Sequence, residues 1–279
     1  RNQDWYVPLG ADGSDSVFDP EDPNIAYLEI QQGTLHRLDR RTEEVIYIKP
    51  QAAPNDPPER WNWDSPIQLS PHNHKRLYFG SQRVWRSDDR GDSWRPISGD
   101  LTTNTNRYEL ETIDQRVWSV DSLYDTGAMS KYATLSAISE SPITEGLLYT
   151  GSDDGLIHVS ADGGENWRKT ELPKIPARSY INDVEASNHN ADTVFAVADA
   201  HKLGDYSPYV FISTNQGRSW QSIAGDLPKD TIVWVIKQDH VDENLLFVGT
   251  EFGVFFSQNG GNEWHELTQQ PTIAVRDLE

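Results

Sequence analysis

Short apolar runs that alternate with polar residues recur along the whole chain and predict β-strands rather than helices. Clear examples occupy residues 25–30, 77–81, 147–151, 194–197 and 245–249. Pro, Asn and Asp cluster before most of these runs, as expected for turns between strands. The pattern therefore predicts an all-β protein built from many short strands.

One octapeptide, Ser-x-Asp/Asn-x-Gly-x-x-Trp, follows four of these runs, at residues 87–94, 160–167, 213–220 and 257–264. The hydroxyl group and the Asp or Asn oxygen can accept hydrogen bonds from backbone amides inside the loop, and the Gly can adopt a positive φ. The Trp can anchor the next strand by apolar packing. We predict a structural role for Ser87, Asp89, Gly91, Trp94, Ser160, Asp162, Gly164, Trp167, Ser213, Asn215, Gly217, Trp220, Ser257, Asn259, Gly261 and Trp264.

The octapeptide resembles the Asp-box, or BNR repeat, of sialidases, sortilins and xyloglucanases. The resemblance implies a β-propeller of four-stranded antiparallel blades, in which the box joins the third and fourth strands away from the ligand face. Five blades are expected at about residues 14–50, 66–100, 135–172, 181–225 and 232–268. Residues 1–279 would then form a single propeller domain, with 1–13 and 271–279 as strands of flanking or shared blades.

Other stretches resemble bacterial exported repeat proteins of the sortilin-like or glycosyl-hydrolase type. They comprise residues 61–67, 69–72, 116–121, 208–211 and 249–253. This resemblance implies part of a larger propeller in an exported protein that is periplasmic, at the cell surface or secreted. Because the chain starts at Arg1 and shows no signal-type segment, we expect any export signal to lie upstream.

Composition narrows the choice of partners. The net charge of -20 argues against nucleic acid or an anionic membrane surface, which require a basic footprint. There is no Cys, and no run of about 18 apolar residues that would span a membrane. A glycan or a peptide remains as ligand, with the rest of a larger chain or complex as a further partner.

Ligand-binding residues are expected on the face opposite the octapeptides, where the links between blades and between second and third strands gather. Indole faces beside Asp and Arg suit sugars and peptides almost equally well, although each Trp could instead pack between blades. The candidates are Trp61, Trp63, Arg116, Trp118, Tyr180, Asp199 and His201.

A glycoside hydrolase would need two carboxylates about 5 to 5.5 Å apart for retention, or about 6.5 to 9.5 Å apart for inversion. The candidate catalytic acids are Asp64, Asp121, Asp153, Asp154 and Glu251, each of which could instead be a solvated or turn-forming carboxylate. Sialidase chemistry, with Arg83, Arg116 and Arg178 around Tyr180, is disfavoured because the N-terminal arginine motif of sialidases is absent.

Cofactor motifs are absent, and we predict neither a cofactor nor a metal. Calcium stays open because residues 12–15 and 153–155 could offer oxygens, although their spacing matches no calcium loop. The leading hypothesis is a ligand- or protein-binding module; the alternatives are a glycoside hydrolase and a structural subunit. Two close carboxylates, one with a strongly raised pKa, would favour the enzyme.

Overall fold

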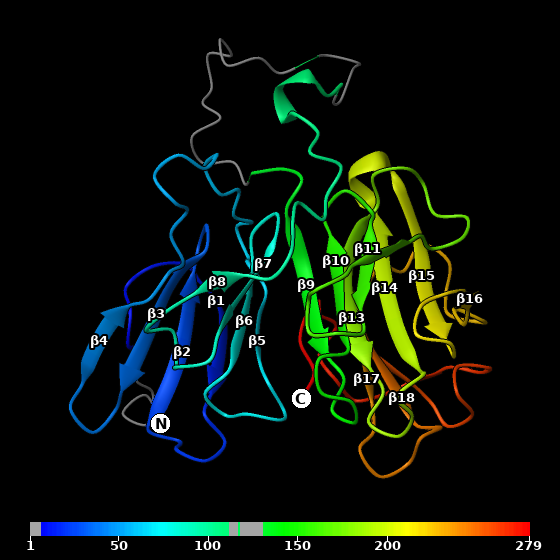
Figure 1. Ribbon diagram of the computed structural model, residues 1–279. Helices are drawn as coiled ribbons and strands as arrows, with labels where there is room; N and C mark the ends of the chain where they lie inside the picture. The colour runs from blue at the N-terminus through cyan, green and yellow to red at the C-terminus, as the bar shows by residue number, and fades with distance from the viewer. Residues whose placement is uncertain (1–6, 112–116, 118–130) are drawn as a thin grey trace. The chain divides into compact units, whose positions relative to one another are not determined.

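A computed structural model describes residues 7–111, 117 and 131–279. These residues form five four-stranded antiparallel sheets, each built from strands that follow one another along the chain (Figure 1). The prediction of an all-β fold of four-stranded blades is confirmed. The chain divides into two compact units: unit 1 contains residues 1–99 and 104–134, and unit 2 contains residues 100–103 and 135–279.

Unit 1 contains two sheets, with the strand orders β1-β2-β3-β4 and β5-β6-β7-β8. Their bounds are β1 (Gly13–Phe18), β2 (Ile25–Ile30), β3 (Thr34–Asp39), β4 (Glu44–Tyr47), β5 (Ile67–Leu69), β6 (Leu77–Gly80), β7 (Val84–Ser87) and β8 (Arg95–Pro96). A short 3-10 helix, η2 (Arg107–Glu109), follows them.

Unit 2 contains three sheets, β9 to β12, β13 to β16 and β17 to β20, again in chain order. Their bounds are β9 (Leu135–Glu140), β10 (Leu148–Ser152), β11 (Ile157–Ser160), β12 (Arg168–Thr170), β13 (Tyr180–Ala186), β14 (Val194–Ala200), β15 (Asp205–Ser213), β16 (Gln221–Ser222), β17 (Val233–Gln238), β18 (Leu246–Thr250), β19 (Gly253–Ser257) and β20 (His265–Glu266). The 3-10 helix η4 (His201–Leu203) lies between β14 and β15.

Second strands form the centre of the core. β6, β10 and β14 are buried at every position, whereas the fourth strands β4, β8, β16 and β20 are exposed. A strand buried on both faces needs apolar or small residues throughout, which explains the continuous apolar runs in the sequence. In unit 2 this burial comes from packing of one sheet on the next, as where β10 and β14 contribute to the same cluster as Ile181 of β13.

The octapeptides form the predicted hairpin turns between third and fourth strands. In the first turn of unit 2, the N–H of Gly164 donates to Ser160 Oγ at 2.9 Å, and Ser160 Oγ donates to Asp162 Oδ1 at 2.8 Å. The same Asp162 oxygen accepts the N–H of Asn166, and Gly164 has a φ of 99°. The equivalent bonds recur in the other three octapeptides, with Asn215 and Asn259 replacing the acid.

Three octapeptide tryptophans tie their blade to the preceding one. The indole N–H donates to Ile48 O from Trp94, to Thr170 Oγ1 from Trp220, and to Ile223 O from Trp264. Trp167 instead bonds Gly164 O within its own turn. The octapeptides thus link neighbouring sheets as well as neighbouring strands.

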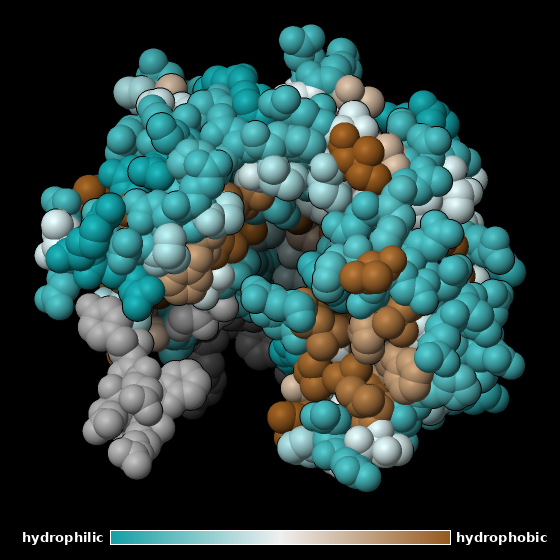
Figure 2. Space-filling view, turned by 90° about the horizontal axis from the view of Figure 1, so that it is seen from below, coloured by the Kyte–Doolittle hydropathy of each residue, from teal (hydrophilic) through white to brown (hydrophobic). Residues whose placement is uncertain are grey.

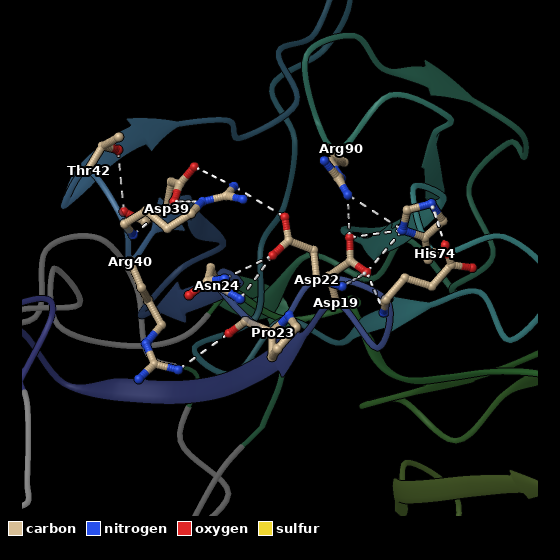
Figure 3. A network of polar contacts seen from close by, with 11 residues as sticks. Asp19, Asp22, Pro23, Asn24, Asp39, Arg40, Thr42, His74 and Arg90 are labelled. Carbon is tan, nitrogen blue, oxygen red and sulfur yellow. Dashed lines mark hydrogen bonds and ion pairs between the residues drawn. The ribbon is translucent and has the colours of Figure 1, made fainter.

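Asp19 anchors a polar network between the two sheets of unit 1 (Figure 3). Its fully buried carboxylate accepts hydrogen bonds from the N–H groups of Glu21 and Asp22 and contacts His74 Nδ1 at 3.0 Å and the Arg90 guanidinium at 2.8 Å. Burial by itself would raise the pKa of Asp19, but these bonds outweigh it and lower the pKa. The network joins the β1–β2 turn to the octapeptide that contains Arg90.

Residues 271–279 differ from the expectation. They alternate in polarity like a strand, yet the structure gives them no strand. Among the described residues, one backbone hydrogen bond joins them to the neighbouring sheet, from Val275 N–H to Thr250 O at 2.8 Å, which is too little for a ladder.

The surface seen in Figure 2 is largely hydrophilic, although apolar side chains gather in one area at the lower right of the view. This agrees with the net charge of -20. Within the described part of the chain, no helix is long and apolar enough to cross a membrane.

We predict that Asp19→Ala lowers the free energy of unfolding by about 3 kcal/mol at pH 7, since it leaves the Arg90 charge and two N–H groups without their acceptor. Because the folded-state pKa of Asp19 is lowered, this contribution exists above the unfolded pKa and is lost as the pH falls through the folded pKa. Urea unfolding at pH 7 and pH 3 would measure it. Asp64→Ala, at an exposed carboxylate, is the control; equal losses in both variants would contradict the prediction.

A second prediction concerns the contact between neighbouring sheets of unit 2. A Cβ at Gly151 would lie 2.4 Å from Ile181 Cγ2, so Gly151→Ala should overpack this contact and cost roughly 1 to 3 kcal/mol. At Gly99 a Cβ meets nothing within 4 Å, and Gly99→Ala is the control. Denaturant midpoints of the two variants should differ, and indistinguishable midpoints would show that the sheets adjust freely.

Candidate functional site

A pocket of about 370 Å³ lies in unit 2, at the ends of the strands opposite the octapeptide turns. Its lining comes from the β14–β15 connection, from the start of β17, from the β18–β19 connection and from the segment 271–279. Helix η4, at the top of unit 2 in Figure 1, marks this end. The lining residues are His201, Tyr206, Asp230, Ile232, Trp234, Glu251, Phe252 and Arg276.

This placement follows from the order of strands within a blade. The octapeptides follow the third strands, whereas the connections around η4 and around Glu251 precede the third strands β15 and β19. Successive antiparallel strands return to opposite ends of the sheet, so the two kinds of connection lie at opposite ends. The pocket therefore lies at the end of the blades where ligand-binding residues are expected, away from the octapeptides.

Trp234 is the central aromatic residue of the pocket. Its indole N–H donates to Glu251 Oε2 at 3.0 Å, which fixes the ring beside a carboxylate. The Arg276 guanidinium lies 4.0 Å from the ring centroid, in cation–π geometry. The His201 ring meets the indole edge-on, with centroids 5.7 Å apart.

Asp199 holds His201 in place. Asp199 is almost fully buried, accepts the backbone N–H of His201 at 3.1 Å and also bonds the ring Nδ1 of His201. Tyr180 is the ladder partner of Asp199 across β13 and β14, and Lys202 Nζ lies 5.0 Å from the centre of its ring. The structure therefore brings together the predicted residues Tyr180, Asp199 and His201 and sets them beside Glu251.

Two of the predicted acids are buried. Asp154 is buried and accepts hydrogen bonds from the N–H and hydroxyl of Thr103 and from Ser152 Oγ, all within 2.7 Å. A carboxylate so fully bonded fastens residues 100–103 to unit 2 and has little capacity left for a substrate. Asp153 beside it is also buried. These contacts give Asp154 a structural role, and a catalytic role for Asp153 stays a prediction.

Trp61, predicted to bind ligand, is a core residue of unit 1. It is only 6% exposed, stacks on Phe79 with centroids 4.9 Å apart, and would meet a Cβ at Gly33 within 2.4 Å. Its buried ring cannot offer a face to a ligand. Trp63 is half-buried, and Asp64 is exposed, with its N–H bonded to Asn62 Oδ1. Arg83 is engaged by Glu59, at 2.9 Å through Nε.

The predicted residues Arg116, Trp118 and Asp121 lie outside the described residues. Conversely, Tyr206, Asp230, Phe252 and Arg276 line the pocket without having been singled out. Residues 272–278 alternate in polarity and were predicted as a strand. That prediction gave no reason to place the Arg276 side chain in a pocket. Asp230 and Phe252 occupy turns and Tyr206 the start of β15, at exposed positions that show no distinctive sequence pattern.

A pair of half-buried acids bridges two neighbouring blades of unit 2. Asp183 and Glu185 lie on one face of β13, and Lys237 on β17 lies 3.4 Å from Glu185 Oε1. Asp183 Oδ2 accepts the N–H of Ile236 at 3.2 Å. Burial raises the pKa of Asp183 to about 6 and that of Glu185 to about 7, so both acids can carry a proton near neutral pH.

A smaller pocket of about 230 Å³ lies on the octapeptide side of unit 2, lined by Val159, Ala161, Asp162, Asn166, Trp167, Arg168, Gln216 and Arg218. Arg168 already donates to the carbonyl oxygens of Gln216 and Gly217, and Arg218 to Asn215 O. These hydrogen bonds hold both arginines in the turns, so their role is mainly structural. Among the described residues, no group of three or more His, Asp and Glu is arranged to hold a metal ion.

Comparison with known proteins supports the fold. No protein-family profile and no curated protein matches the sequence. Among solved structures, an ancestral GH74 enzyme is similar at a TM-score of 0.65 and 16% identity, over 94% of this chain and 32% of that one. The GH74 xyloglucanase from Xanthomonas campestris gives 0.60 and 16%, over 91% and 38%. The Dos1 propeller gives 0.61 and 10%, over 93% and 61%.

The chain thus spans about a third of the length of the GH74 structures that it matches. At such low identity the similarity shows the fold alone. Together with the five four-stranded sheets, it identifies the chain as a series of β-propeller blades, part of a propeller.

The raised pKa of Glu185 predicts a pH dependence of stability. A raised folded-state pKa favours the protonated form, so this contribution is complete below the unfolded value of 4.5 and is lost as the pH rises to about 7. Glu185→Gln cannot titrate, so its stability relative to wild type should increase by roughly 1 to 3 kcal/mol between pH 4.5 and pH 7.5. Urea unfolding at both pH values would measure this difference. Glu165→Gln, at an exposed acid, is the control; if both variants showed the same change, burial at Glu185 would not be its cause.

Proposed function

We propose that the chain is a non-catalytic binding module within a longer, exported Asp-box propeller protein of the sortilin-like type, and that the Trp234 pocket is its ligand site. The octapeptide turns with their Ser, Asp or Asn and Gly bonds support the Asp-box assignment. The propeller neighbours, whose chains are longer than this one, support a place in a larger protein.

The observation that carries the binding site is the convergence of aromatic and charged groups in one pocket. Trp234 comes from the start of β17, Tyr206 from the start of β15 and Phe252 from the β18–β19 connection, and Tyr206 and Phe252 are 49% and 58% exposed. Exposed aromatic rings with hydrogen-bonding groups at their edges are typical of sites that hold peptides or sugars. Glu251 and the Asp199–His201 pair supply such groups here.

The same contacts argue for binding over chemistry. Glu251 uses one oxygen for the indole of Trp234, and Asp154 is bonded by Thr103 and Ser152. Each acid thus has a structural partner in the folded chain. Glycoside hydrolysis requires two acids that both face the glycosidic bond, one as general acid and one as base or nucleophile. Acids bonded to structural partners do not meet this requirement.

A glycoside hydrolase remains the second candidate, because Asp183 and Glu185 are close in sequence, share a strand face and have raised pKa values. A protonated carboxyl near pH 7 is what a general acid needs. Against this candidate, both acids already bridge β13 to β17 through Lys237 and Ile236.

Arrays of oligosaccharides and of peptides, probed with the full chain, would test the proposal. We expect ligands whose binding is lost in Trp234→Ala and reduced at least fivefold in Tyr206→Ala, with no cleavage products by mass spectrometry. Tyr47→Ala is the matched control, since Tyr47 is 54% exposed but belongs to β4 in unit 1.

Binding that survives both pocket variants would place the site elsewhere. Turnover that disappears in Glu185→Gln or Asp183→Asn, with folding retained, would replace the binding module by the hydrolase.

A further inference from the structure

The Trp234 pocket contains a segment of the chain itself, residues 271–279, and this segment indicates the chemistry of the ligand. We propose that the pocket is a cation cage that recognises an arginine or lysine side chain carried by an extended peptide, and that Arg276 occupies it in cis. This inference rests on the proposed binding site and specifies its ligand class.

The segment is seated by its backbone. Val275 N–H donates to Thr250 O at 2.8 Å, at the end of β18. A Cβ at Gly249 would lie 2.4 Å from Val275 O and 3.1 Å from Val275 Cγ1, so the close approach of the segment depends on a glycine at this position. The segment thus crosses the end of β18, an inner strand of its sheet, and does not extend the sheet as a further strand.

The side chain after this bond is exposed and lies over the Trp234 ring. Arg276 places its guanidinium 4.0 Å from the centroid of the Trp234 ring, and Glu251 is bonded to the same indole. Asp230 also lines the pocket, as do the exposed rings of Tyr206 and Phe252. Aromatic faces attract cations through their quadrupole, and the carboxylates of Glu251 and Asp230 in the lining add longer-range charge attraction.

Long-range charge favours the same ligand class. With a net charge of -20, the chain attracts a basic peptide and repels an acidic one during the approach to the surface. A neutral sugar would need an open indole face for stacking, and on Trp234 the guanidinium of Arg276 already covers such a face. The cation is therefore the better match to the pocket as it stands.

Occupancy in cis has a measurable consequence. A tethered group competes at an effective concentration that reaches about the millimolar range for short linkers, so a free peptide must displace Arg276. Removing the Arg276 charge should therefore strengthen the binding of a basic peptide from solution. An ordinary binding surface would show no such gain.

The experiment uses the full chain and a capped synthetic peptide with the sequence of residues 272–278, together with its Arg276→Gln version. Isothermal titration calorimetry would measure both peptides against wild type and Arg276→Gln. We expect the basic peptide to bind the Arg276→Gln chain at least about threefold more tightly than wild type. The Gln peptide should bind that chain about two- to fivefold more weakly than the basic one, as expected for the loss of an exposed cation–π contact. Arg95→Gln, at an exposed arginine of β8 in unit 1, is the control and should bind like wild type.

Two further variants locate the contact. Glu251→Gln retains an oxygen for the indole but removes the charge, so in the Arg276→Gln background it should weaken the basic peptide and reduce the salt dependence of its binding. Tyr206→Ala changes an exposed side chain and should weaken binding without unfolding the protein, which a thermal melt would verify. Tyr47→Ala should have no effect.

Each outcome has a defined meaning. Equal affinities of the basic and Gln peptides, or no detectable binding of the basic peptide to the Arg276→Gln chain, would overturn the cation cage. Array hits that depend on Trp234 would still stand in either case, so the binding site could survive without this ligand class. Equal affinity of the basic peptide for wild type and Arg276→Gln would overturn occupancy in cis. Binding unaffected by Glu251→Gln and Tyr206→Ala would reject the pocket for this ligand.

Discussion

The hydroxyl group of the first serine in each octapeptide is the constraint on which the blades depend. It accepts the N–H of the glycine four residues later and donates to the Asp or Asn side chain, so one oxygen closes the turn between third and fourth strands. The closed turn sets the direction of the tryptophan that follows. In three cases this tryptophan bonds the preceding blade, so a local turn becomes a contact between sheets.

The octapeptides fix the turns at one end of the blades, and the connections at the other end can vary in sequence. On the octapeptide side, polar groups form hydrogen bonds within the turns, as Arg168 and Arg218 do. At the opposite end the connections differ from blade to blade, and in unit 2 three of them and the segment 271–279 line one pocket. A repeated scaffold with variable connections is a common way of building a binding surface.

The sequence predicted the repeats well because their signals are local. Strand alternation, turn residues and the octapeptide depend on neighbours within a few positions, and each sheet matches one predicted repeat to within one residue at its start. Trp61 was misplaced because its burial depends on Gly33 and Phe79, which are distant in sequence. Arg276 was missed for the converse reason: its alternating surroundings predicted a strand, although the segment forms none and contacts the sheet through the Val275 bond and the Arg276–Trp234 pair. The surroundings of a side chain depend on tertiary packing, which local sequence patterns do not predict.

The replacement of aspartate by asparagine in two of the octapeptides has a consequence for acid resistance. The carboxylate of Asp162 is held by Asn166 and Ser160, which lowers its pKa to about 2, and the pKa of Asp89 is also lowered despite the opposing effect of burial. These two turns weaken as the pH falls through the folded-state pKa values, because a protonated carboxyl loses acceptor capacity. Asn215 and Asn259 make the same bonds with a group that does not titrate. Blades with the same turn geometry therefore differ in acid tolerance, and the last two blades of unit 2 keep all their turn bonds at a pH that weakens those of the first.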